Sequence, residues 1–247
     1  MNESSKHMPF PDVSADRLAW LTTDQMIEVD RVMIEDLHIE LIQMMENAGR
    51  SLAILSNKLV SPASADVYVG PGGNGGGGLV AARHLAVAGV DVSVIAAGDT
   101  EKYTPIPRHQ LDGVQRMGIP VSSESTRTPD VIVDAMLGYS LKGAPRPPFD
   151  SLIANANASG APIIALDTPS GLDTATGETV GEVIDATATL TLAMPKVGLR
   201  DGAEGQLRKH LGELYLATIS VPNSVYDGLG FDISSPFGVA PILRVVI

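Results

Sequence analysis

The stretch GPGGNGGGG, residues 70–78, places seven glycines in nine positions between a short apolar run and an expected helix. Glycine lets backbone approach a ligand closely, and the amides at the start of a helix favour an anion. Gly70, Gly72 and Gly75 also satisfy the G-x-G-x-x-G spacing of a dinucleotide site, although so many glycines would satisfy almost any such pattern. Glycines stand where a P-loop needs lysine and Ser/Thr, which excludes that motif. The stretch predicts a phosphate-facing backbone cradle, and the alternative is a turn that is glycine-rich only for packing.

Two aspartates follow apolar runs further along the chain. Asp134 lies within VIVDAMLG, and Asp167 closes IIALD before a Pro-Ser-Gly turn. A carboxylate on an apolar strand is costly unless it is paired or hydrogen-bonded, so Asp134 should meet a cation or the backbone amides of a strand end. Asp167 is placed for general acid–base chemistry. Ser170 raises the alternative of a serine hydrolase, which the absence of G-x-S-x-G and of a strand-end histidine disfavours.

The elements that must position these residues alternate in type. Apolar residues recur at helical spacing over residues 22–37, 41–59, 79–88, 107–117 and 149–158, with Thr22 or Thr23 as the first cap. Short apolar runs predict strands at residues 67–69, 90–97, 131–137, 162–166, 187–194 and 214–221. Residues 118–129 are expected to be a surface connection. This order predicts a doubly wound parallel sheet whose ligands bind at the carboxyl ends of the strands.

Composition narrows the class of protein further. The chain has 247 residues, of which 44% are hydrophobic, and a formal net charge of -12. That charge argues against nucleic acid or an anionic membrane as a partner. With no cysteine, the chain has no disulfides, thiolate metal sites or cysteine nucleophile. No apolar run reaches the roughly 18 residues of a membrane span, and we expect a single cytoplasmic domain over residues 1–247, with a polar extension (1–21) and a C-terminal tail (223–247).

Four motifs taken in order resemble one family. GPGGNGGGGL, IVDAMLGYSLKG, LDTPSGLD and AMPK (193–196) are similar to the motif series of the YjeF N-terminal domain family, whose best-known activity is NAD(P)H-hydrate epimerase. The resemblance runs from about residue 22, through ENAGRSLA (46–53), to about residue 222. It implies a Rossmann-like three-layer α/β/α sandwich with a mostly parallel central sheet. It also implies a homodimer and a strand-end site for hydrated NADH or NADPH with a potassium ion nearby.

The resemblance also assigns roles to single residues. Asn74, Asp134 and Ser170 correspond to the groups near potassium, and they offer the hard oxygen ligands that an alkali cation requires. Asp167 matches the aspartate thought to act on the hydrated ring, with Lys142 a weaker candidate for ordering phosphate or developing charge. The residues expected to bind the nucleotide are Gly72, Gly73, Asn74, Gly75, Gly76, Gly77, Gly138, Tyr139, Ser140, Leu141, Lys142, Gly143 and Asp167. The nucleotide would be a substrate rather than a redox cofactor, and a separate ADP- or ATP-dependent dehydratase would consume one epimer.

The chain departs from the family pattern at three positions. Gly73 stands where the family has its first asparagine, Gly77 where it has aspartate, and Ala144 at a position that is often acidic. If Gly77 caps the helix, the structural cost is a few tenths of a kcal/mol, whereas a lost charged hydrogen bond to the ligand costs about 1.5–3 kcal/mol. The retained polar residues favour an epimerase, and the departures favour a non-catalytic nucleotide-binding or scaffold module. An NAD(P)-dependent dehydrogenase, with Asp99 on a ribose, is a more distant alternative.

Overall fold

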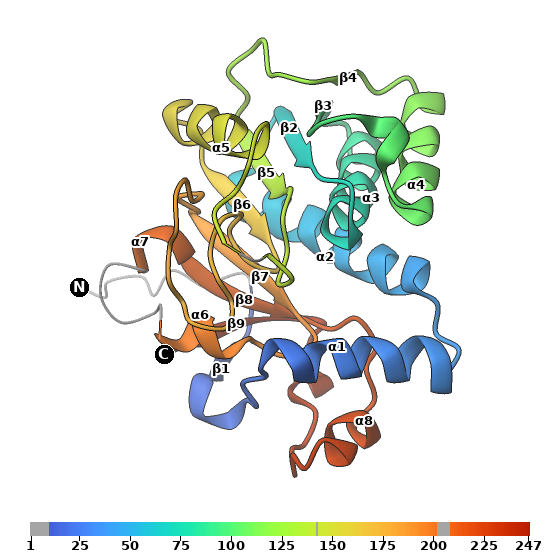
Figure 1. Ribbon diagram of the computed structural model, residues 1–247, viewed down its shortest axis with the longest axis vertical. Coiled ribbons are helices and arrows are strands. Elements are labelled where there is room, and N and C mark those ends of the chain that lie inside the picture. Colours follow the sequence, from blue (N-terminus) through green and yellow to red (C-terminus); the bar gives the residue numbers. More distant parts are fainter. Residues whose placement is uncertain (1–9, 142, 202–207) are drawn as a thin grey trace, which may run out of the picture.

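Residues 10–141, 143–201 and 208–247 are described by the computed structural model of this chain (Figure 1). They contain a mostly parallel nine-stranded sheet in the order β1-β9-β8-β7-β6-β5-β2-β3-β4, in which only the β8–β9 pair is antiparallel. The strands are β1 (Asp12–Ser14), β2 (Ser64–Val69), β3 (Asp91–Ala96), β4 (Val121–Ser122), β5 (Val131–Ala135), β6 (Ile163–Leu166), β7 (Ala188–Leu192), β8 (Glu213–Ala217) and β9 (Ile242–Val246). The predicted α/β class is confirmed, as are the six strands expected from apolar runs.

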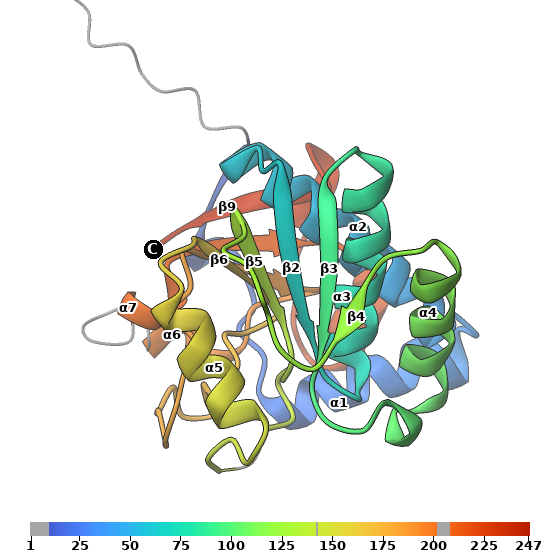
Figure 2. The ribbon, with the colours of Figure 1, turned by 90° about the horizontal axis from the view of Figure 1, so that it is seen from above.

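Helices cover both faces of the sheet, which gives the three layers seen in Figure 2. On one face lie α2 (Leu41–Val60) and α3 (Gly73–Val87), with α4 (Pro105–Arg116) against α3, and α5 (Phe149–Ala158) covers the other face. In front of the strand ends runs α1 (Thr23–Arg31), which continues into one π-helical turn (Val32–Asp36). The remaining helical segments are α6 (Val197–Asp201), α7 (Arg208–Leu211), α8 (Asn223–Gly228) and the 3-10 turns Ala15–Arg17, Thr100–Lys102 and Pro236–Gly238.

Because both faces of the sheet are covered by helices, the central strands carry apolar side chains at nearly every position. In β2, Ala65, Val67 and Val69 join the core beneath α2 and α3, whereas Tyr68 joins the core beneath α5. Successive residues of a strand point to opposite faces, so a central strand needs apolar side chains at nearly every position. At the start of α1, the predicted cap is Thr22, whose hydroxyl accepts from the Gln25 amide.

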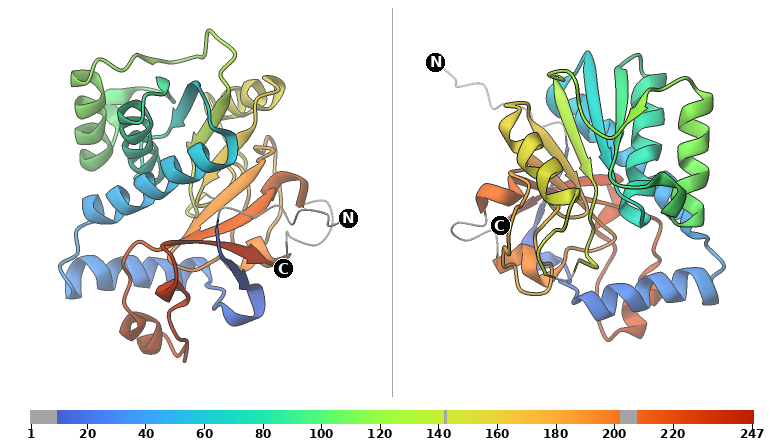
Figure 3. Two further views of the ribbon diagram at one scale, coloured as in Figure 1. Left: turned by 180° about the vertical axis from the view of Figure 1, so that it is seen from behind. Right: turned by 45° about the horizontal axis from the view of Figure 1, so that its top comes forward.

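The structure differs from the sequence prediction at both ends of the chain. The expected extension contains β1 and the expected tail contains β9, and these two strands pair at the edge of the sheet (Figure 3). The expected connection at 118–129 contains the edge strand β4. Strands of two or three residues are too short to show a period, and ILRVV of β9 lies beyond the predicted alternation.

A further difference concerns the glycine stretch. The helix predicted to begin at residue 79 begins at Gly73, so most of the glycines are helical. Glycine is a poor helix former, so propensity alone places the boundary too late, and close packing overrides it. Among the helices of the described residues, none is both long and apolar enough to cross a membrane.

Candidate active site

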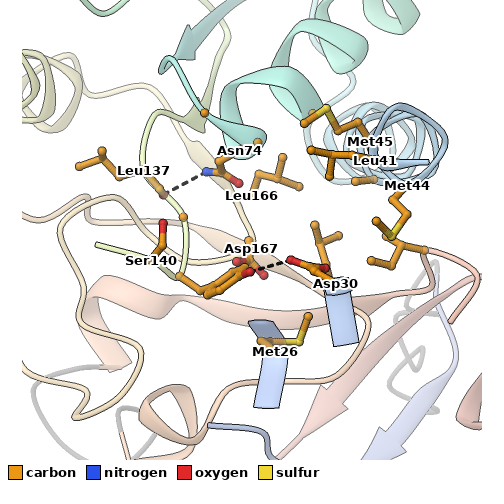
Figure 4. Close-up of a pocket in the computed structure, with 18 of the residues that line it drawn as sticks. Met26, Asp30, Leu41, Met44, Met45, Asn74, Leu137, Ser140, Leu166 and Asp167 are labelled. Atoms are coloured by element: carbon orange, nitrogen blue, oxygen red, sulfur yellow. Dashed lines mark hydrogen bonds between the residues drawn. The ribbon is translucent and has the colours of Figure 1, made fainter. Parts of the chain in front are cut away.

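A cavity of about 570 Å³ lies at the carboxyl ends of the central strands (Figure 4). Its walls come from α1, the start of α2, the start of α3 and the loops that follow β5, β6 and β7. The α1 and α2 walls are apolar, with Met26, Leu41, Met44 and Met45. A cavity of this size at this edge of an open α/β sheet is where such folds bind small ligands.

The glycine-rich start of α3 divides into an exposed part and a packed part. Gly72 is the N-cap, and Gly72, Gly73 and Asn74 line the cavity. Gly75 and Gly76 are buried and do not line it, and their role as nucleotide contacts stays a prediction. A Cβ at Gly75 would overlap the Gly70 carbonyl oxygen, so its side is closed by backbone. Packing therefore explains the glycines that face other backbone, and the remaining glycines form part of the cavity wall.

Gly77 lines the cavity but does not cap the helix, so the condition under which its structural cost would be a few tenths of a kcal/mol is not met. It is the fifth residue of α3, where a Cβ would lie 2.7 Å from Leu166 Cδ2. On the α2 side, a Cβ at Gly49 would overlap the Gly77 carbonyl oxygen. Glycines on both helices therefore permit the close approach of α2 and α3, and a side chain at Gly77 would displace Leu166.

The loop after β5 lines the cavity through Gly138, Tyr139, Ser140 and Leu141. Gly143 lies outside the lining, in a left-handed conformation with φ 74°. Lys142 lies outside the described residues. Most of the nucleotide-binding residues expected on this loop therefore face the cavity.

The three expected potassium ligands lie close together behind this loop. Asn74 Nδ2 donates to the Leu137 carbonyl oxygen at 3.0 Å, and the Leu137 amide donates to Ser170 Oγ at 2.9 Å. Ser170 in turn donates to Asp134 from its amide at 2.7 Å and from its hydroxyl at 2.6 Å. The predicted cluster of oxygen-bearing side chains is therefore connected through one loop residue.

Asp134 is fully buried on β5. Burial raises its pKa to about 6, against the opposing effect of the hydrogen bonds from Ser170 and from the Met136 amide. In the described residues these hydrogen bonds, and no cationic side chain, satisfy the carboxyl group. The backbone-amide alternative for Asp134 therefore matches its protein partners, together with the Ser170 hydroxyl.

Asp167 follows β6 in a left-handed conformation with φ 65° and forms a buried ion pair with Lys196. Lys196 Nζ also donates to the Leu192 carbonyl oxygen at 3.1 Å and to Thr191 Oγ1 at 3.3 Å. Asp167 and Lys196 both line the cavity, and Lys196 is 0% exposed. The sequence prediction gave Lys196 no role, and the available signal was a lysine among apolar residues in AMPKVGL, which would need a partner if the segment were buried.

Asp30 is a second cavity-lining carboxyl group that sequence analysis missed. It lies on α1 and accepts a hydrogen bond of 2.6 Å from the Tyr139 hydroxyl. Burial raises the pKa of Asp30, the nearby Asp167 adds to this, and the hydrogen bond and the charge of Lys196 oppose it. Burial and the charge of Asp30 also raise the pKa of Tyr139. The signal in the sequence was spacing, because Asp30 follows Met26 by four residues and so shares its inward face of α1.

A doubly wound sheet with a largely apolar cavity at its carboxyl edge, into which a few polar side chains converge, is the architecture of a ligand-binding α/β protein. The family described as YjeF-related protein N-terminus matches residues 41–198, and this chain belongs to that family.

Curated relatives extend the match over most of the chain. An NAD(P)H-hydrate epimerase of Dehalogenimonas lykanthroporepellens is 38% identical over 247 residues, which cover 96% of this chain and 97% of the relative. A bifunctional NAD(P)H-hydrate repair enzyme of Hyperthermus butylicus is 41% identical over 206 residues, 78% of this chain and 37% of the relative. This chain therefore spans well under half of that longer relative.

Among solved structures, the yeast protein ynu0 matches with a TM-score of 0.78 and 24% identity. The match covers 92% of this chain and all of the yeast chain. It supports the fold.

Proposed function

We propose that this protein is an isomerase that interconverts the R and S epimers of hydrated NADH and NADPH, a reaction of nicotinamide nucleotide repair. The observation that carries the proposal is the buried Asp167–Lys196 pair on the wall of a cavity of about 570 Å³. The names of the relatives support the same activity.

The chemistry requires a group that exchanges protons with the hydrated ring. Hydration places a hydroxyl on the ring carbon next to the ring nitrogen, and inversion there requires a C–O or C–N bond to break and re-form. Either route needs proton transfer, and we assign it to the Asp167 carboxylate. The Lys196 ammonium orients that carboxylate and stabilises its negative charge. No net oxidation or reduction occurs, so the nucleotide is the substrate.

We assign the phosphate end of the substrate to the start of α3. The first amides of a helix have no intrahelical acceptor and carry partial positive charge. Here Gly72 and Gly73 bear no side chain to keep an anion away from those amides. The loop Gly138–Leu141 faces the same cavity and is the proposed ribose and ring contact, with Lys142 and Gly143 following it in sequence.

We also propose a potassium ion held by Asn74, Asp134 and Ser170. The fit rests on the donor set, which consists of an amide oxygen, a carboxylate and a hydroxyl, and on a buried carboxyl group without a cationic partner among the described side chains. Asn74 uses its side-chain nitrogen for the hydrogen bond to the Leu137 carbonyl oxygen, and that bond leaves its amide oxygen as a ligand for the ion. The ion would neutralise Asp134 and fix the loop that lines the cavity.

The family resemblance extends the proposal to a cytoplasmic homodimer. We further propose that a separate ADP- or ATP-dependent dehydratase consumes one epimer. Relatives that are named bifunctional repair enzymes are consistent with a second activity acting on the same nucleotide.

A non-catalytic nucleotide-binding module is the second candidate. It is favoured by Gly77, because the carboxylate that the family usually places there, and its contact with the ligand, are missing. An aspartate at this position would collide with Leu166. The buried Asp167–Lys196 pair argues against it, because a scaffold gains nothing from two desolvated charges beside an open cavity.

The test is a coupled assay. The R epimer of hydrated NADH is mixed with a dehydratase that accepts only the S epimer, and NADH recovery is followed by absorbance with and without this protein. We expect acceleration over spontaneous epimerisation, and loss of that acceleration in Asp167→Asn. The matched control is Asp99→Asn, because Asp99 also follows a strand but lies outside the cavity. Failure of the wild-type protein to accelerate NADH recovery would refute the proposal.

A further inference from the structure

The cavity brings together two carboxyl groups that come from distant parts of the sequence. Asp167 follows β6, whereas Asp30 lies on α1, and both line the cavity beside Tyr139 (Figure 4). The negative charge of Asp167 disfavours ionisation of Asp30 and so helps to raise the pKa of Asp30. The proposed function above uses only one of the two.

The charges at this end of the cavity do not balance. Of the cavity-lining residues that the structure describes, Lys196 alone carries a positive charge, and it is bound to Asp167. Two ionised carboxylates would leave a net negative charge against an apolar wall that includes Met26 and Met44. Such a cluster favours one carboxyl group that keeps its proton. Asp30 is the better holder of that proton, because its partner is a neutral hydroxyl and not an ammonium.

We propose that Asp30 is a second catalytic residue, which delivers a proton to the ring nitrogen while Asp167 takes one from the substrate hydroxyl. This inference rests on the proposed epimerase function. The pair would act on the N–C–O group of the hydrated ring, whose nitrogen and oxygen are bonded to the same carbon. Two neighbouring carboxyl groups match that arrangement.

The proton transfers balance in both directions. The Asp167 carboxylate takes the hydroxyl proton as the C=O bond forms, and the C–N bond breaks with its electron pair on the ring nitrogen. Asp30, as the carboxylic acid, protonates that nitrogen and becomes the carboxylate. Rotation about the adjacent C–C bond presents the other face of the carbonyl, and reversal of the same transfers closes the ring and restores both groups.

Tyr139 is a positioning residue in this scheme. Its hydroxyl donates to Asp30 Oδ2, which links the loop after β5 to α1. Its backbone carbonyl accepts from Thr174 Oγ1 at 3.0 Å, which links the same loop to the segment after β6. The groups that face Asp30 are therefore Tyr139, Lys196 and Asp167, and Arg31 follows it on its own helix with Glu28, Glu35 and Asp36 as partners. A merely structural Asp30 would anchor Tyr139 and nothing more.

The pH profile of the coupled assay separates the two roles. We expect Asp30→Asn to lower kcat by about 100-fold or more with KM within about threefold, and Asp30→Glu to restore part of the rate. In the wild-type protein, activity should fall at alkaline pH as Asp30 loses its proton, and this limb should disappear in Asp30→Asn. Removing the donor in Tyr139→Phe should raise the pKa of Asp30 and move the limb to higher pH. The matched control is Glu28→Gln, a change on the exposed side of α1.

Oxygen labelling tests the bond that breaks. In ¹⁸O-enriched water, ring opening retains the substrate oxygen through one epimerisation, whereas loss of the hydroxyl exchanges it. We expect retention. Exchange at the rate of epimerisation, or a folded Asp30→Asn with wild-type rate and pH profile, would overturn the assignment of Asp30. A wild-type protein without activity would instead refute the proposed function, so the two failures are distinguishable.

Discussion

The two ends of the cavity are built in opposite ways. At the start of α3, backbone forms the wall, because Gly72 and Gly73 have no side chains and the glycines behind them pack tightly. At the other end, charged side chains form the wall, with Lys196 and Asp167 almost entirely out of solvent. The glycine end lets a ligand approach the backbone closely, and the other end holds an ion pair in a fixed position.

The difference shows where this chain can vary. Backbone amides are supplied by any residue that keeps the helix start in place, so the glycine end tolerates departures such as Gly73. A buried ion pair has no such freedom, because removal of one partner leaves the other desolvated and unpaired. Changes at the charged end should therefore have the largest effects, and changes at the glycine end should depend on the space around each position.

The largest effect is expected from Lys196→Met. The change leaves the Asp167 carboxylate buried without its cation, and we expect the free energy of unfolding at pH 7.5 to fall by about 3–5 kcal/mol. Urea denaturation measures it. The matched variant is Asp167→Asn combined with Lys196→Met, which removes both charges and should recover most of the loss. A double variant no more stable than Lys196→Met would contradict a dominant role for the unpaired charge.

Asp134 should make stability depend on pH. Its pKa is about 6 in the folded protein against an ordinary 3.8, so the folded state binds the proton more tightly than the unfolded state. In potassium-free buffer, ionised Asp134 therefore lowers the free energy of unfolding by about 3 kcal/mol above pH 6. This destabilisation disappears below pH 4, where the group is protonated in both the folded and the unfolded state. We expect the difference between wild type and Asp134→Asn in urea midpoint to change with pH between 4 and 7.

The check on this prediction is the pair of profiles taken together. Wild-type stability relative to the variant should fall as pH rises through 4 to 6, the range in which folded Asp134 is still protonated and the unfolded group is not. Parallel profiles for the two proteins would show that Asp134 titrates alike in the folded and unfolded states.

The sheet and much of the cavity could be predicted from sequence because periodicity and strand-end position carry them. Asp167 and the loop Gly138–Leu141 lie at the carboxyl edge, as an alternating strand and helix order requires. Asp30 could not be placed there in the same way, since its contact with Tyr139 spans 109 residues of sequence. Contacts between distant segments depend on how helices pack, which local patterns do not encode.

The glycine stretch illustrates the same limit in another form. Its composition predicts a turn that precedes the helix, whereas the structure places most of it inside the buried start of α3. The deciding facts are neighbours that the local sequence does not contain, namely Gly49 and Met45 on α2 and Leu166 on β6. A glycine required by packing and a glycine required by a ligand look alike until those neighbours are known.

Gly75→Ala tests the packed part of the stretch. The new Cβ would meet the Gly70 carbonyl oxygen, which is backbone and cannot rotate away, so we expect a loss of about 1–3 kcal/mol of unfolding free energy or more. The matched control is Gly113→Ala in α4, where the space is open and alanine should stabilise by about 0.5–1 kcal/mol. Equal effects at the two positions would show that helix propensity, and not packing, governs the glycine end.

Gly73→Asn should have the smallest effect on stability and the clearest effect on binding. A Cβ there meets only Met45 Cε at 3.6 Å, an ordinary contact, so the unfolding free energy should stay within about 0.5 kcal/mol. The added amide can make one hydrogen bond to a bound nucleotide, worth about 0.5–1.5 kcal/mol, or roughly two- to tenfold in Kd for NADP by calorimetry. Gly77→Asp is the contrasting variant, because its side chain would displace Leu166 and should lower stability by about 1–3 kcal/mol. If Gly73→Asn destabilised the fold as much as Gly77→Asp, the division of this helix start into an open part and a packed part would be wrong.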